Sequence, residues 1–218
     1  MVKFRNIYKS TIMTHTMALI YGIDESVLKA IEEEYKQESA LDVLIGDGSL
    51  AEREELNTGL INVISNPREV AYAFNHIELG PGKTLIDLGT GYGMPLVIGH
   101  LMGADVKGPE LVAANAQVAW QKFEALREKG ISVPPYDAIE VGKNIEDYDI
   151  SQADAIFAFL AAQKQSETVK RFYFFAKGSA SLIIYRPVIE CYQTVLNLSL
   201  GAPFAGSHEH PFMIIKRH

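Results

Sequence analysis

The sequence predicts an α/β fold: a doubly wound sheet of seven strands that ends in an antiparallel hairpin and is preceded by helices. Three observations support this prediction. From residue 66 onward, short apolar runs typical of buried strands alternate with longer segments of helical spacing. Such alternation predicts parallel strands with helices on both faces of the sheet. The last two apolar runs, 192–198 and 211–217, have no clear helix between them, which predicts an antiparallel pair.

Helices are expected ahead of the sheet. Apolar residues recur at helical spacing from Asp24 onward, and Asp24 is placed to cap that helix. A capping-box pattern begins a second helix at Ser49 that continues to about Ile64, and Pro67 takes the first helical position of a third. We therefore expect residues 1–65 to form a helical lid or substrate-binding segment, and residues 66–218 to form the main domain.

The expected sheet follows a Gly-Pro-Gly turn at 80–82, which stops the third helix. The strands are expected at 84–86, 104–107, 138–141, 153–159 and 180–185. The helices that connect them are expected at 95–102, 111–129 and 163–176. In a sheet of this kind, ligands bind at the carboxyl ends of the strands.

Composition restricts the partners and the compartment. The formal net charge is −7 and the pI is near 5.4, which argues against broad electrostatic binding to nucleic acid or to an anionic membrane. Cys191 is the single cysteine, so an internal disulfide and a cysteine-rich zinc site are excluded. The apolar run 17–21 is too short for a signal-peptide core or a membrane span. We expect a cytoplasmic protein without a nucleic-acid or membrane partner, and the oligomeric state stays open.

The segment from Asp87 to Gly93, DLGTGYG, is the most distinctive part of the sequence. It stands between an expected strand and an expected helix, and its three glycines let the backbone turn sharply and approach a ligand closely. Glu110 follows Asp87 by 23 positions (110 − 87), about where a nucleotide-binding fold carries its ribose-binding acid. The alternative for Glu110 is a surface acid that is favoured by the dipole of the following helix.

Two classes of nucleotide site compete for this pattern. A dinucleotide site uses GxGxxG so that a pyrophosphate can rest on the helix N-terminus. This chain instead has GxGxG at Gly89, Gly91 and Gly93, with Asp87 two residues before the first glycine. A carboxylate at that place would repel a pyrophosphate and suits a ligand with a cationic amine.

DLGTGYG, followed by a strand that ends in an acid, resembles motif I and its acidic partner in the class I S-adenosylmethionine-dependent methyltransferases. The resemblance covers about residues 66–217, includes the terminal hairpin, and implies a Rossmann-like fold with S-adenosyl-L-methionine as cofactor. It implies that Asp87 orients the cofactor ammonium and that Glu110 holds the ribose hydroxyls. The loop residues that it implies as backbone contacts are Gly89, Thr90, Gly91 and Gly93.

The expected adenine contact departs from the family pattern. Members often carry an acid just after the glycine that ends the third strand, whereas here Gly142 is followed by Lys143 and Asn144. An amide oxygen can accept the same hydrogen bond, so Asn144 is the candidate, with a plain turn residue as the alternative and Glu146 and Asp147 in reserve. The family contacts the methionine portion at the end of the fourth strand, here Ala158 and Phe159. Phe159 could shape the methyl-transfer channel or merely pack.

The methyl acceptor is not named by any motif. The family members that methylate amino groups of bases carry an Asn/Asp-Pro-Pro-aromatic motif after the fourth strand. This chain has FAFLAAQ there, which counts against N-methylation of adenine or cytosine. The sequence also resembles, in its spacing, the bacterial and mitochondrial protein-lysine methyltransferases. The expected acceptor is therefore either a protein side chain or a small molecule.

The catalytic residues are unknown from the sequence. Tyr185 and Arg186, at the carboxyl end of the fifth strand, are the best-placed candidates to touch an acceptor. The histidines that could act as a base are His15, His76, His100, His208 and His210. Those at 76 and 100 are better explained as satisfied helix residues, and those at 208 and 210 as part of an exposed loop, so no metal site is expected.

Three functions remain after this reasoning. The leading one is a methyltransferase. The alternative is a non-catalytic binding module that retains the methyltransferase fold, which the unusual turn at 142–144 and the missing acceptor motif favour. A nicotinamide oxidoreductase is disfavoured by GxGxG and by the antiparallel ending.

Overall fold

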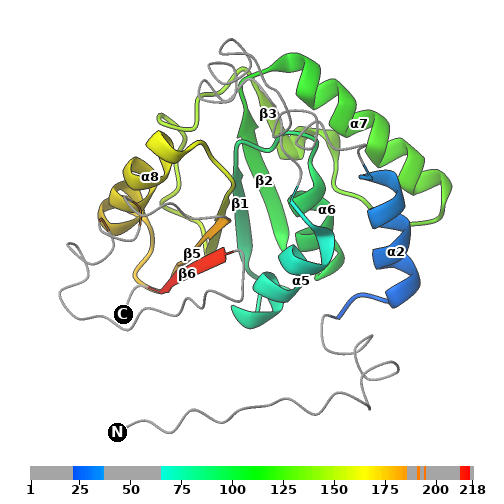
Figure 1. The fold of residues 1–218 in the computed structure, drawn as a ribbon, viewed down its shortest axis with the longest axis horizontal. Coiled ribbons are helices and arrows are strands. Elements are labelled where there is room, and N and C mark those ends of the chain that lie inside the picture. The colour runs from blue at the N-terminus through cyan, green and yellow to red at the C-terminus, as the bar shows by residue number, and fades with distance from the viewer. Residues whose placement is uncertain (1–21, 37–64, 186–190, 192–193, 195–211, 217–218) are drawn as a thin grey trace, which may run out of the picture.

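The computed structural model describes residues 22–36, 65–185, 191, 194 and 212–216. These residues form a twisted sheet with helices against both faces (Figure 1). The strands are β1 (Thr84–Leu88), β2 (Asp105–Glu110), β3 (Ile139–Val141), β4 (Ala155–Ala158), β5 (Ser181–Tyr185) and β6 (Phe212–Lys216). The helices are α2 (Glu25–Glu34), α5 (Pro67–His76), α6 (Met94–Leu101), α7 (Ala113–Glu128) and α8 (Ala162–Phe175), with a 3₁₀ turn at Tyr136–Ala138.

The sheet order is β3-β2-β1-β4-β5-β6. The first five strands are parallel, and β6 runs antiparallel to β5 with Tyr185 opposite Phe212. The chain moves from β1 outward to β3 and then returns to place β4 on the other side of β1. The strand order therefore reverses beside β1, and the carboxyl ends of β1 and β4 border the crevice in which such sheets bind ligands.

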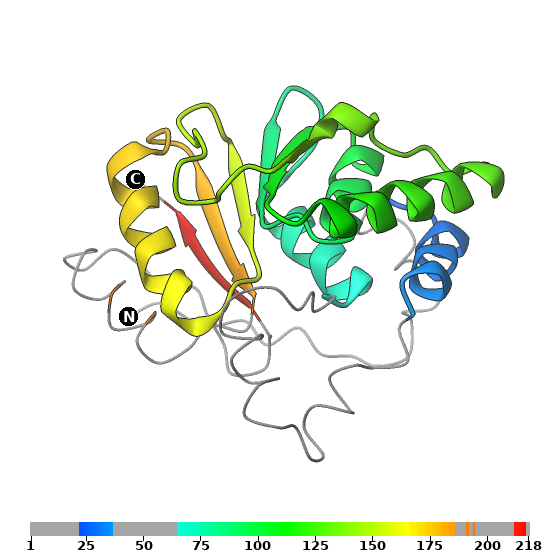
Figure 2. The ribbon, with the colours of Figure 1, turned by 90° about the horizontal axis from the view of Figure 1, so that it is seen from above.

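Alternate residues of each strand enter two separate cores. Leu85 and Val106 pack with α5, α6 and α7 on one face, whereas Ile86 and Leu88 pack with α8 on the other. Figure 2, which looks along the sheet, shows α8 alone on one side and the other helices on the opposite side. Both faces are thus covered, which explains why the strands read as continuous apolar runs rather than as alternating patterns.

The helix starts expected from the sequence are confirmed at both described positions. Asp24 Oδ1 accepts a hydrogen bond of 2.7 Å from the backbone N–H of Ser26, ahead of α2. Asn66 Oδ1 accepts from the N–H groups of Arg68 at 2.9 Å and Glu69 at 3.3 Å, and Pro67 opens α5. These side chains satisfy donors that the first turn of a helix leaves unpaired.

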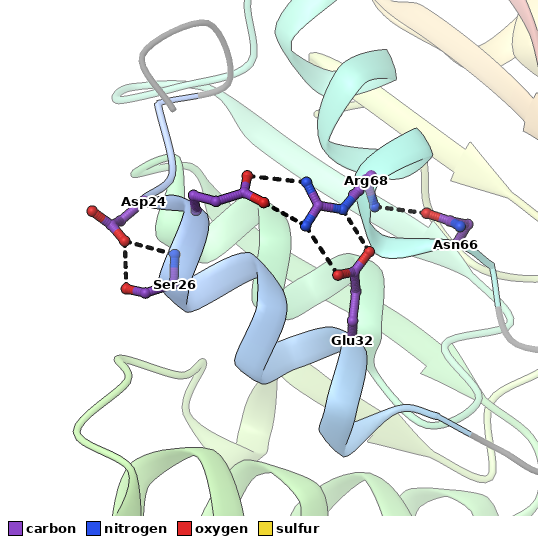
Figure 3. A network of polar contacts seen from close by, with 6 residues as sticks. Asp24, Ser26, Glu32, Asn66 and Arg68 are labelled. Atoms are coloured by element: carbon purple, nitrogen blue, oxygen red, sulfur yellow. Dashed lines mark hydrogen bonds and ion pairs between the residues drawn. The ribbon is translucent and has the colours of Figure 1, made fainter. Parts of the chain in front are cut away.

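Helix α2 is fastened to the domain by charge and by an aromatic residue. The guanidinium of Arg68 in α5 binds the carboxylates of Glu25 and Glu32, at 2.7 Å for the shortest contact to each (Figure 3). At the other end of α2, the hydroxyl of Tyr35 donates to the carbonyl of Tyr92 at 3.0 Å. Because Tyr92 belongs to the glycine loop, α2 buttresses that loop directly.

The structure differs from the expectations in three places. Strand β2 continues to Glu110 rather than ending at 107, and α7 begins at Ala113 rather than at 111. The expected strand at 192–198 is wrong at Thr194, which is helical, as is Cys191. Apolar residues 191, 195 and 198 also fit a helical spacing, which the strand interpretation overlooked. The described residues contain six strands, so the seventh is not confirmed.

Other expectations lie outside the described residues. They are the segment 1–21, the apolar patch 41–45 and the helix 49–64, so the prediction of a lid over residues 1–65 stays a prediction. Within the described ranges, no helix has both the length and the apolar character that crossing a membrane requires.

Candidate functional site

The glycine loop lies between β1 and α6, at the carboxyl edge of the sheet. Its three glycines all have positive φ angles, of 80° at Gly89, 56° at Gly91 and 80° at Gly93, in the region that other residues rarely adopt. At Gly93, which precedes α6, a Cβ would also lie only 2.7 Å from Cζ of Phe123. The loop therefore requires glycine for its conformation and for the packing of α7 beneath it.

The loop is also held against β2. The backbone N–H of Thr90 donates to the carbonyl of Pro109 at 3.1 Å, and the Thr90 hydroxyl lies 3.2 Å from the same oxygen. Beneath this contact, β2 approaches so closely that a Cβ on Gly108 would lie 2.2 Å from the carbonyl oxygen of Asp87. Thr90 is 3% exposed, so its role in this structure is to fix the loop.

Glu110 ties the loop to the start of α7. Its Oε2 accepts from the N–H of Gly91 at 2.7 Å, and its Oε1 accepts from the N–H of Val112 at 2.8 Å and lies 3.4 Å from Nδ2 of Asn115. The side chain is only 5% exposed, which excludes a plain surface acid. Two elements that are 19 residues apart along the chain thus meet at one carboxylate.

Asp87 places a second carboxyl group beside the first. It is 2% exposed, and its Oδ2 has no hydrogen-bond partner among the described residues. Burial, and then the charge of Glu110, raise the pKa of Asp87 well above its usual value. A buried acceptor without a donor is rare in folded proteins, which makes this atom a candidate contact for a ligand donor.

Replacing Glu110 by Gln is expected to destabilise the protein by about 1–3 kcal/mol, because an amide nitrogen would then face a backbone donor that the carboxylate now satisfies. The measurement is the free energy of unfolding in urea. Glu128→Gln, an exposed position at the end of α7, is the matched control and should change that energy by less than about 0.5 kcal/mol. Equal stability of the Glu110 and Glu128 variants would contradict the bridging role.

The expected adenine contact lies at the same edge of the sheet. The N–H of Gly142 donates to the carbonyl of Glu110 at 2.7 Å, which places the turn after β3 next to that acid. Asn144 is exposed, and its Oδ1 accepts from the N–H of Glu146 at 3.1 Å. One lone pair of that oxygen is thus used within the turn, and a second can still accept. The reserve candidates Glu146 and Asp147 are exposed as well, and Glu146 pairs with Lys164.

Two apolar residues at this edge were missed by the sequence reasoning. Leu111 directly follows Glu110 and is 59% exposed, and Val141 pairs with Glu110 in the sheet and is 38% exposed. For Leu111 the sequence did carry a signal, since a large apolar residue directly follows the acid at the end of a buried strand.

The end of β4 continues the site on the other side of β1. Ala158 pairs with Leu88 and is fully buried. Phe159 is half-buried and sets its ring edge-on to Tyr185, with the ring centres 4.7 Å apart. Leu160 reaches the glycine loop, where a Cβ on Gly89 would be 3.3 Å from its Cδ2.

The candidate catalytic residues do not gather at one place in the structure. Tyr185 is 2% exposed and donates its hydroxyl hydrogen to Glu69 of α5, a residue that the sequence reasoning did not single out. His76 is exposed and stacks on Tyr72, and Nε2 of His100 lies 2.9 Å from the Ser132 hydroxyl at the far end of α6. Arg186, His15, His208 and His210 lie outside the described residues.

Several solved structures have the same fold, and three of them are methyltransferases or methylases. An RNA methyltransferase from Salinibacter ruber in complex with S-adenosyl-L-homocysteine aligns with a TM-score of 0.54 and 14% identity, over 71% of this chain and 94% of that one. A ribosomal protein L11 methylase from Lactobacillus delbrueckii subsp. bulgaricus gives 0.52 and 16%, over 69% and 78%. A SAM-dependent O-methyltransferase from Thermotoga maritima gives 0.51 and 16%, over 74% and 68%.

At the level of sequence, neither a protein-family model nor a curated protein gives a significant match. Identities as low as those above establish a common fold and leave the reaction open. The sheet order, the antiparallel last strand and these structural neighbours all indicate the same fold. The chain therefore has the fold of the class I S-adenosylmethionine-dependent methyltransferases.

Proposed function

We propose that this protein is an S-adenosyl-L-methionine-dependent methyltransferase that acts on a protein side chain or a small molecule. The observation that carries the proposal is the buried, unpartnered Oδ2 of Asp87 beside the glycine loop. It fits the cationic ammonium of this cofactor, because a cation with N–H donors supplies both the charge and the hydrogen bond that this atom lacks.

The other residues of the site fit the same ligand. Glu110 already accepts from two backbone N–H groups and from Nδ2 of Asn115, yet its Oε2 has a further lone pair for a ribose hydroxyl. The glycines keep side chains out of the space above the loop. On the far side of Glu110, the exposed Leu111 and Val141 offer apolar surface to a purine ring, and Asn144 offers an amide oxygen to its amino group.

The same residues disfavour a dinucleotide. Asp87 and Glu110 are both buried at the loop, so two carboxyl groups would face a pyrophosphate bound there. A pyrophosphate, with two negative charges, is strongly unfavourable next to buried acids, since little water screens their repulsion.

In the proposed reaction, the main task of the protein is to position the cofactor and the acceptor. The sulfonium of the cofactor supplies an electrophilic methyl group, and an acceptor must approach it in line. Ala158 and Phe159 would border the methionine portion, and Tyr185 stands behind Phe159 on the acceptor side. The net charge of −7 supports a protein or small-molecule acceptor, although proteins with this fold include RNA methyltransferases.

A non-catalytic binding module is the second candidate. The observation in its favour is that Oδ1 of Asn144 already accepts a hydrogen bond from the N–H of Glu146. Asn144 lies in the turn where the family often has an acid. Such a module would bind the cofactor and transfer nothing.

Incubation with methyl-labelled S-adenosylmethionine and fractionated cell lysate separates the two functions. The proposal expects label in a protein or a small-molecule fraction with the wild-type chain, and much less label with Asp87→Asn when the labelled cofactor is below saturation. Cofactor binding without label in any fraction would favour the binding module. Equal labelling by the wild-type and Asp87→Asn chains would contradict the proposed site.

A further inference from the structure

A carboxylate and a phenol meet at the start of α5. The hydroxyl of Tyr185, the last residue of β5, donates to Oε2 of Glu69 and lies 3.4 Å from the backbone N–H of Asn66. Asn66 and Glu69 form the two ends of an N-x-x-E capping box, in which the acid ordinarily bonds to the N–H of the cap residue. Here the tyrosine hydroxyl stands between them, so the acid faces the end of the sheet.

No cation in the described part of the chain neutralises Glu69. Its neighbour Arg68 turns the other way, toward α2, where it makes four hydrogen bonds to Glu25 and Glu32 (Figure 3). None of the ion pairs among the described residues includes Glu69. Glu69 is half-buried, so its charge is neither paired nor fully in water.

This acid is connected to the candidate cofactor site by direct contacts. Glu69 binds Tyr185, whose ring packs on Phe159 at 4.7 Å between ring centres. Phe159 follows Ala158, which pairs with Leu88 of β1, and the next residue, Leu160, borders Gly89. Glu69 is therefore linked to the glycine loop through Tyr185, Phe159 and Leu160, at the carboxyl edge of the sheet.

We propose that Glu69, held in place by Tyr185, is the acceptor-side carboxylate of the methyl-transfer site, and that the methyl acceptor is an amine. This inference rests on the proposed function. A carboxylate beside aromatic rings binds an amine in both of its forms, because it accepts N–H hydrogen bonds and the ring faces attract positive charge. An acidic acceptor would be repelled from the same place.

The carboxylate also suits the charge change of the reaction. The lone pair of the neutral amine nitrogen forms the new bond to the methyl carbon, and the bond between that carbon and sulfur breaks with its electron pair remaining on sulfur. The nitrogen becomes positively charged as the sulfonium is neutralised, and it then releases one proton to water. Glu69 would stabilise the positive charge that develops on nitrogen, which is stabilisation where the transition state requires it.

The binding of sinefungin tests this inference without any acceptor. Sinefungin is an analogue of S-adenosylmethionine in which an amine-bearing carbon replaces the methylated sulfur, so its amine points where the methyl group would. Calorimetric titration should show that the wild-type chain prefers sinefungin to S-adenosylhomocysteine. Glu69→Gln should reduce that preference by about tenfold or more, the value of a charge-assisted hydrogen bond, with binding of S-adenosylhomocysteine unchanged.

Two further variants separate the role of Glu69 from general effects. Tyr185→Phe should reduce the preference in the same direction, because Glu69 loses its hydroxyl partner. Glu124→Gln removes a carboxylate of α7 that pairs with Arg127 and should leave the preference unchanged. The inference is overturned if the wild-type chain shows no preference for sinefungin, or if Glu69→Gln retains it. Failure of S-adenosylhomocysteine to bind the wild-type chain would instead overturn the proposed function.

Discussion

Replacing Asp87 by Asn is expected to weaken binding of S-adenosylhomocysteine by about 10- to 100-fold, the loss expected for one charge-assisted hydrogen bond. The variant keeps the shape of the side chain and removes the charge that the ammonium would meet. The dissociation constant from calorimetry is the measurement. Asp137→Asn, at an exposed position of the 3₁₀ turn, is the control and should bind like the wild-type chain.

The same substitution is expected not to lower the stability of the ligand-free protein. Burial raises the pKa of Asp87, so the folded state holds this proton more tightly than the unfolded chain, whose aspartates have a pKa of about 3.9. The contribution of Asp87 to stability therefore falls as the pH rises from that value toward the raised pKa of the folded state. Asp87→Asn should remove this fall, as measured by urea unfolding at several pH values.

The affinity for the cofactor should change with pH in the opposite direction. A cationic ammonium binds the ionised form of Asp87, so binding releases a proton, and the affinity should rise with pH until the ligand-free carboxyl group is ionised. A large loss of stability in Asp87→Asn together with unchanged affinity would show that Asp87 is a structural residue and would overturn its assigned role.

Replacing Gly108 by Ala is expected to destabilise the protein by about 3 kcal/mol or more. The new Cβ would lie 2.2 Å from the carbonyl oxygen of Asp87 and 2.6 Å from Oγ1 of Thr90. Neither the backbone of β1 nor that of β2 can yield easily, because both strands are inside the sheet. The free energy of unfolding in urea is the measurement, and cofactor binding should weaken as well because the glycine loop must shift.

Gly178→Ala is the matched control for this substitution. A Cβ at Gly178 meets nothing within 4 Å, and its backbone conformation suits other residues, so the stability should change by less than about 0.5 kcal/mol. If Gly108→Ala proved as stable as Gly178→Ala, the close approach of β2 to β1 would be wrong, and with it the packing that shapes the loop.

The local signals of the sequence were sufficient for most elements of the fold. Asp24 and the Asn66-Pro67 step start helices because short side-chain acceptors and a fixed φ act on the nearest residues. The end of β2 was less predictable, since Gly108 and Pro109 resemble a break in the strand. Gly108 is required there by contact with β1, which no local pattern shows.

The residues of the site were also predictable only where they belong to one continuous segment. Asp87, Glu110 and the glycines could be identified because their spacing is a property of one continuous segment. The bond from Gly91 to Glu110 supports that reading by joining the two ends of the segment. Glu69 was not predicted as a site residue, because its partner, Tyr185, is 116 residues away in the sequence. Its only local signal, the N-x-x-E capping box, indicates a helix start and says nothing about a site.

Titration of S-adenosylhomocysteine into the wild-type protein, followed by calorimetry, tests the central claim most directly. The site described above predicts saturable binding of one ligand per chain, a higher melting temperature in its presence, and no competition from a nicotinamide dinucleotide. The absence of heat and of any thermal shift with S-adenosylhomocysteine, or tight binding of the dinucleotide in its place, would contradict the claim.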